Sequence, residues 1–137
     1  MASEAPYAAL SGLFVAGLLA AAKRAGRDRG AGPTTATDIA ALGLAAAKVG
    51  KVVAEDRVTV FLRRPFADGP AAVQPRGEGL TRAIGELVTC PHCVSLWAAG
   101  ILGAAQVAQP RAARFVTRVL AAYAVADAVA PRLRARD

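Results

Sequence analysis

The chain has 137 residues, 55% of them hydrophobic, and carries a formal net charge of +7 at pH 7. This length fits one domain and leaves no room for a catalytic domain beside a membrane domain. Alanine, the strongest helix former, supplies much of the apolar fraction, whereas β-branched and aromatic residues are sparse. No segment alternates polar with apolar residues, so we expect a single all-α domain over residues 1–137.

The positive charge is carried mostly by arginines that lie between the apolar segments. This distribution favours loops at a membrane surface that face anionic lipid. Aromatic residues that could stack on nucleotides do not interleave with the bases, so we predict no nucleic-acid partner. The bases concerned are Lys23, Arg24, Arg27, Arg29, Arg57, Arg63, Arg64, Arg76 and Arg82.

The first apolar segment, residues 5–22, has no charged residue and is followed directly by Lys23 and Arg24. As a helix it would be about 27 Å long, near the lower limit for crossing a bilayer. A cleaved signal peptide is the alternative, but the positive charges follow the apolar part instead of preceding it, which favours an uncleaved anchor. Residues 23–36 are rich in glycine and arginine and are expected to form a loop.

Residues 37–62 are predicted to form an amphipathic helix. Apolar residues recur at three- and four-residue spacing, while Lys48, Lys51 and Glu55 form a stripe elsewhere. The helix either lies in the membrane interface or crosses the bilayer with snorkelling lysines. Consecutive charges at residues 55–57 would be costly inside a membrane, which favours the interface. The apolar positions are Ile39, Leu42, Ala46, Val49, Val53 and Val60.

Prolines and glycines are dense in residues 63–86, which predicts an exposed loop. The strongest span follows at about residues 92–110, inside a stretch without acidic or basic residues. Small residues recur there every four positions, which favours close helix packing in lipid, although an alanine-rich chain can produce this spacing by chance. The packing candidates on this helix are Ser95, Ala99, Gly103 and Trp97.

The last predicted span covers residues 112–130, where Tyr123 and Asp127 share a face. Asp127 lies one turn before the helix end, so headgroup depth would account for its charge. The expected architecture is a small multi-pass membrane helical bundle of three or four helices. If three helices cross, the distribution of bases places the cysteines at the cytoplasmic face; if residues 37–62 also cross, the bases divide almost evenly between the two sides.

Cys90-Pro91-His92-Cys93 begins an apolar helix, with Cys90 as the predicted N-cap and Cys93 three residues into the first turn. Free backbone amides at that end favour the Cys90 thiolate. One hypothesis is therefore a membrane thiol–disulfide protein in which Cys90 attacks, Cys93 resolves, and His92 or Glu86 moves the proton. The chain has no second cysteine pair to relay electrons.

Two other roles for the cysteines remain open. A structural zinc ion needs four ligands, which Cys90 and Cys93 could supply only twice over in a dimer, because the chain has no further cysteine and only one histidine. Simple packing of small apolar thiols is the interpretation we favour. The residues identify no cofactor.

A set of residues in the second half of the chain is similar to a known family. They are Asp56, Arg63, Pro65, Phe66, Gly85-Glu86-Leu87, Thr89-Cys90-Pro91, Cys93 and Trp97. Over about residues 39–130 the chain resembles the bacterial membrane-protein family known as domain of unknown function 1360, which includes a sporulation-associated membrane protein type. The chain departs from the family pattern at His92 and Ser95. The resemblance implies a small multi-pass protein of the bacterial cell membrane and brings no established reaction.

Asp56 falls on the apolar side of the helix predicted for residues 37–62, where a charge should be paired. Arg63 and Arg82 are the candidate partners. Glu86, just before the cysteines, is expected to form an ion pair or to accept a thiol proton, and a structural salt bridge is favoured for both acids. The predicted function is a non-enzymatic membrane protein that anchors or organises a partner, including a second copy of itself; a soluble helical bundle is the third alternative.

Overall fold

The computed structural model describes residues 4–27 and 34–135, and these are mostly helical, as the composition predicts. The long helices are α1 (Ala5–Ala25), α2 (Ala36–Glu55), α5 (Pro91–Ala108) and α6 (Pro110–Arg134). The short elements between α2 and α5 are η1 (Arg57–Thr59), α3 (Val60–Arg63), β1 (Ala67–Asp68), β2 (Gln74–Pro75) and α4 (Gly79–Thr89).

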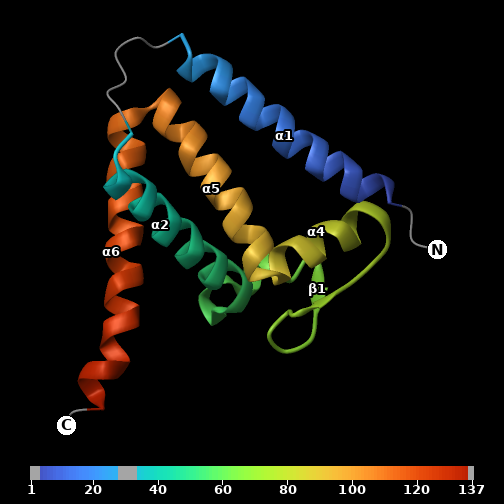
Figure 1. Ribbon diagram of the computed structural model, residues 1–137. Helices are drawn as coiled ribbons and strands as arrows, with labels where there is room; N and C mark the ends of the chain where they lie inside the picture. The colour runs from blue at the N-terminus through green and yellow to red at the C-terminus, as the bar shows by residue number, and fades with distance from the viewer. Residues whose placement is uncertain (1–3, 28–33, 136–137) are drawn as a thin grey trace.

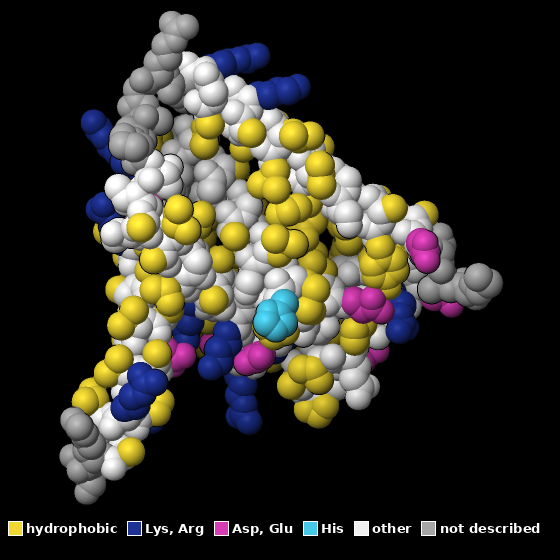
Figure 2. Space-filling view, in the orientation of Figure 1, with side chains coloured by type: hydrophobic (Ala, Val, Ile, Leu, Met, Phe, Trp, Pro, Cys, Tyr) yellow, Lys and Arg dark blue, Asp and Glu magenta, His cyan; other side chains and the backbone are white. Residues whose placement is uncertain are grey.

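The four long helices form a bundle in which α1 and α5 run in one direction and α2 and α6 in the opposite one (Figure 1). Helix α2 packs against both α5 and α6, while α1 packs against α5 and α4. Helix α4 meets α5 at an angle of 90° at one end of the bundle. The space-filling view shows hydrophobic side chains over the middle of the visible face and charged side chains mainly towards its ends (Figure 2).

Helix α2 is shorter than the helix predicted for residues 37–62. A capping box begins it, because the Thr35 hydroxyl accepts a hydrogen bond from the backbone N–H of Asp38 while the Asp38 carboxylate accepts one from the N–H of Thr35. The helix ends at Glu55 because Asp56 is extended (φ −73°, ψ 148°), and η1 and α3 follow. The apolar periodicity continues across this break, so the sequence alone does not reveal where the helix ends. Helix α2 lies alongside α5 and α6, so α4, and not α2, is the helix that lies across the bundle end.

The segment predicted as a loop, residues 63–86, contains a short hairpin and most of α4. Strands β1 and β2 pair antiparallel, with Ala67 opposite Pro75. Gly77 and Gly79 have φ values of 76° and 58°, which glycine adopts without strain, and they turn the chain into α4. The glycines that favoured a loop prediction therefore form the turn from which α4 begins.

The interior of the bundle is built from small side chains and large hydrophobic side chains lie outside. In the described parts of the chain, every buried hydrophobic residue except Val94 is an alanine. Leu13, Ile101 and Phe115 expose 65%, 62% and 69% of their surface, respectively. A soluble helical protein of this size normally buries its leucines and phenylalanines. The buried alanines are Ala45, Ala46, Ala54, Ala67, Ala72, Ala83, Ala98, Ala113 and Ala121.

By length and composition, α1 is the one described helix that could cross a membrane unaided, with a mean hydropathy of 1.7. Helices α4 and α5 reach the same standard only when taken together, as a span broken by their 90° bend. Helix α6 falls short because Arg118 and Asp127 lie within it and further arginines lie towards both of its ends. Of the predicted spans, residues 5–22 thus correspond to a candidate membrane helix, whereas 92–110 and 112–130 do not qualify individually.

Candidate functional site: the cysteine pair and its surroundings

The two cysteines meet at the corner between α4 and α5. Cys90 is the N-cap of α5, as predicted, because Pro91 begins the helix and the Cys90 sulfur accepts a hydrogen bond from the Cys93 N–H at 3.3 Å. The Cys93 thiol donates to the Cys90 sulfur, with 2.6 Å between the two Sγ atoms. Both cysteines are free and half-buried. A disulfide could therefore form without movement of the helices.

These hydrogen bonds make the two thiols chemically different. The pKa of Cys90 lies below its usual value because the Cys93 thiol and the backbone N–H of Cys93 both donate to its sulfur, and the His92 backbone acts in the same sense. Partial burial opposes this shift but does not cancel it. Cys90 is therefore the thiol that ionises first, and Cys93 is the neighbour positioned to bond with it.

The His92 side chain is exposed and makes no hydrogen bond to another described residue. Across residues 4–27 and 34–135, no three side chains of histidine, cysteine, aspartate or glutamate come together in a way that could hold a metal ion. A zinc site at Cys90 and Cys93 would need ligands from a second chain.

Glu86 ties α4 to the N-terminal helix. Its carboxylate accepts a hydrogen bond from the Tyr7 hydroxyl at 2.7 Å and from the Arg82 Nε at 3.1 Å. Arg82 thus pairs with Glu86, one helical turn away, and not with Asp56. Tyr7 was not singled out by the sequence, because nothing in it indicates that residues 79 positions apart would meet.

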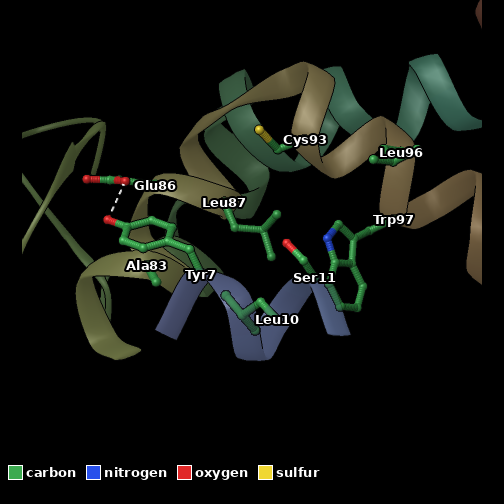
Figure 3. A pocket seen from close by; sticks show the side chains of 9 residues that line it. All are labelled: Tyr7, Leu10, Ser11, Ala83, Glu86, Leu87, Cys93, Leu96 and Trp97. Carbon is green, nitrogen blue, oxygen red and sulfur yellow. Dashed lines mark hydrogen bonds between the residues drawn. The ribbon is translucent and has the colours of Figure 1, made fainter. Parts of the chain in front are cut away.

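A cavity of about 340 Å³ lies between α1, α4 and α5, beside the cysteine pair (Figure 3). Its walls are mostly apolar, with the Tyr7–Glu86 hydrogen bond at one side and Cys93 and Trp97 at the other. Cys93 lines this cavity but Cys90 does not. The lining residues are Tyr7, Leu10, Ser11, Ala83, Glu86, Leu87, Cys93, Leu96 and Trp97.

Arg63 is completely buried, and its guanidinium uses all five N–H donors. The acceptors are the Thr59 hydroxyl and four backbone carbonyls, those of Val53, Asp56, Ala71 and Ala72. Asp56 therefore contacts Arg63 through its carbonyl oxygen and not through its carboxylate. Two of these carbonyls belong to the end of α2, where the helix dipole is negative and stabilises a cation. Arg63 thus ties the end of α2 to Thr59 and to residues 71–72.

The structure also contains an ion pair between α2 and α6. Lys48 is 6% exposed, and its Nζ lies 2.8 Å from the Asp127 carboxylate and 4.1 Å from the centre of the Tyr123 ring. The Asp127 carboxylate also lies 3.8 Å from the Lys51 Nζ. The sequence placed Tyr123 and Asp127 on one face of α6, but assigned Asp127 to headgroup depth because it did not show that α2 covers that face.

The predicted small-residue stripe on α5 is only partly a packing surface. Ser95 faces Gly50 of α2, where an added Cβ would lie 2.5 Å from the Pro91 carbonyl oxygen. Ala99 is half-buried, and a Cβ at Gly103 would meet nothing within 4 Å. Trp97 instead packs on Phe14 of α1, with ring centres 4.9 Å apart.

Comparison with known proteins gives a family and no function. No curated protein and no solved structure matches the chain. A family model described as "Protein of unknown function (DUF1360)" matches residues 41–131, a range that includes the cysteine pair and leaves α1 outside. Because this match covers well over half of the chain, the protein belongs to the DUF1360 family.

Proposed function

We propose that this protein is an integral protein of the bacterial cell membrane that crosses the bilayer with α1, α2, α5 and α6 and anchors or organises a partner there. The observation that carries this proposal is the arrangement of apolar residues, with alanines inside and large hydrophobic side chains outside. In lipid, helix association depends on close backbone approach through small residues, while leucine and phenylalanine are at no disadvantage on the outer surface. In water, the same exposed surface would promote aggregation.

Membrane fractionation tests this proposal. The protein should stay with the membrane in high salt and in alkaline carbonate, because apolar helices and not basic loops hold it. A variant lacking residues 4–27 distinguishes a bundle of spans from a single anchor, because α2, α5 and α6 should still be retained. Release of the full-length protein by salt alone would contradict the proposal.

The number of crossings is tested with single cysteines in a Cys90→Ser/Cys93→Ser background. If α2 crosses the membrane, Gly26→Cys and Gly69→Cys lie on opposite sides, so an impermeant maleimide should label only one of them in intact cells. If α2 lies in the interface, both positions lie on the same side and behave alike. Because the bases divide almost evenly between the two ends in the four-crossing arrangement, the positive-inside rule gives no orientation here.

The end of the bundle opposite the cysteines is the better candidate for contact with anionic lipid. Of the described acidic residues only Asp38 lies at this end, and it is close to Arg114 and Arg118. Phosphatidylglycerol vesicles should therefore stabilise the protein more than phosphatidylcholine vesicles do, and Arg114→Gln/Arg118→Gln should remove much of the difference. Among the described residues, the bases at this end are Lys23, Arg24, Arg27, Arg111, Arg114 and Arg118.

A second candidate function, thiol–disulfide exchange, is favoured by the contact between Cys90 and Cys93. One thiol is stabilised as a thiolate by helix amides, and the second is in position to form the disulfide. Trapping with a heavy maleimide in cells should find the pair partly oxidised and should follow the redox conditions reversibly. A pair that stays reduced under mild oxidants, together with normal insertion of Cys90→Ala and Cys93→Ala, would indicate packing alone.

A further inference from the structure

The cavity that Cys93 lines places one thiol of the cysteine pair beside walls suited to an apolar ring. Leu10, Leu87 and Leu96 contribute apolar surface, and Trp97 offers an aromatic ring (Figure 3). A volume of about 340 Å³ is within the lower part of the range seen for small-molecule sites. It suffices for one substituted ring with the start of a tail, while the rest of a tail would extend along the exposed apolar surface of α1.

The polar groups of the cavity point to a ligand that accepts hydrogen bonds. The Trp97 indole N–H and the Ser11 hydroxyl donate to no other group in the described parts of the chain, and both residues line the cavity. Glu86, in contrast, already accepts hydrogen bonds from Tyr7 and Arg82. An uncharged carbonyl oxygen would satisfy the open donors without bringing a charge into an apolar site.

We propose that this cavity binds a lipid-soluble quinone, which accepts the two electrons of the Cys90–Cys93 dithiol. This inference rests on thiol exchange, the second candidate function above. A dithiol at the end of a membrane bundle can pass its electrons to an acceptor that diffuses in the lipid, and the chain contains no second cysteine pair to relay them further.

The positions of the two sulfurs give the order of steps. Cys93, the cysteine that lines the cavity, adds through its sulfur to a ring carbon and forms a C–S bond while its proton passes along the hydrogen bond to the Cys90 sulfur. Cys90 then gives that proton to a ring oxygen and attacks the Cys93 sulfur. The S–S bond forms, the C–S bond breaks, and its electron pair returns to the ring. One proton from water completes the hydroquinone and replaces the proton that Cys90 lost on ionising.

Binding is measured first, and apart from the reaction. Trp97 is the only tryptophan in the chain, so quenching of its fluorescence by decyl-ubiquinone reports this cavity directly. In detergent, quenching should saturate, and it should persist in Cys90→Ser/Cys93→Ser, which cannot react. Ser11→Leu, which fills the cavity and removes one donor, should weaken binding at least tenfold, whereas Ala9→Leu on the same helix and outside the cavity should not. A ring ligand of the same size without carbonyl oxygens should bind weakly.

The reaction is then followed without oxygen, starting from reduced protein. One hydroquinone should form for every two thiols lost, and Cys90→Ser and Cys93→Ser should each form none. Quenching that does not saturate, or that Ser11→Leu and Ala9→Leu affect equally, would overturn the cavity as a quinone site even if the cysteines cycle in cells. Saturable binding with no loss of thiols would overturn the electron transfer to the quinone, whereas trapping of the cysteines in cells decides separately whether they exchange electrons at all.

Discussion

Replacing Arg63 by lysine tests whether the buried guanidinium organises the segment after α2. Lysine keeps the positive charge but offers three N–H donors instead of five, so at least two of the five buried acceptors lose their partner. A buried acceptor without a partner costs about 1–3 kcal/mol, and since the two longest bonds are the weakest, we expect Arg63→Lys to lower the free energy of unfolding by about 2–4 kcal/mol. The neighbouring Arg64 is exposed, so Arg64→Lys is a matched control with little expected effect.

The assay is thermal unfolding of the purified protein in detergent, followed by circular dichroism. The expected loss corresponds to a midpoint lower by about 6–15 °C for a chain of this size. Arg63→Met is a second variant, expected to be at least as damaging because it leaves all five acceptors unpaired. The reasoning would be refuted if Arg63→Lys unfolded at the same temperature as Arg64→Lys.

Three further predictions concern helix packing and the thiols. Gly50→Ala should lower the free energy of unfolding by about 1–3 kcal/mol, because the added Cβ would press on the Pro91 carbonyl. Gly43→Ala, with open space around it, should be neutral or stabilising by up to about 1 kcal/mol, and the two variants are compared by their unfolding midpoints. Asp127→Asn should destabilise by about 1–3 kcal/mol because Lys48 is buried, and Lys48→Met/Asp127→Leu should recover most of that loss; an additive double variant would speak against the pairing. The rate of Cys90 alkylation should rise with pH through a midpoint below the usual thiol value of 9.0, because the lowered pKa of Cys90 makes its thiolate available at lower pH. Cys93→Ala should move that midpoint upward. Equal midpoints in the two proteins would exclude the Cys93 thiol hydrogen bond as the cause.

Local features of the fold were predictable because they depend on neighbouring residues. The apolar first helix, the N-cap at Cys90 and the overall helical content follow from composition, spacing and capping chemistry. The end of α2 at Glu55 and the start of α4 at Gly79 were missed. In the first case the apolar periodicity continues across the break, and in the second a pair of glycines begins a helix instead of preventing one.

Contacts between distant parts of the chain could not be read from the sequence. Tyr7 with Glu86 and Lys48 with Asp127 join residues 79 positions apart, and only the packing of α1 on α4 and of α2 on α6 creates them. The hydrogen-bond partners of Arg63 could not be predicted for the same reason, because its charge suggested a carboxylate partner. Counting charges cannot show that backbone carbonyls at a helix end will accept the hydrogen bonds of a guanidinium.

The alanine-built interior has a consequence for how this protein can change. A core of leucines can be altered in both directions, by trimming or by enlarging, but a core that already consists of nearly the smallest side chain can change only towards greater bulk. A saturation mutagenesis map should therefore rank substitutions at Ala45, Ala98 and Ala121 by volume and not by polarity, with glycine and serine tolerated and valine already harmful. If the outer surface faces lipid, as proposed, the outward-facing positions should show the opposite rule, tolerating any apolar size and rejecting charge.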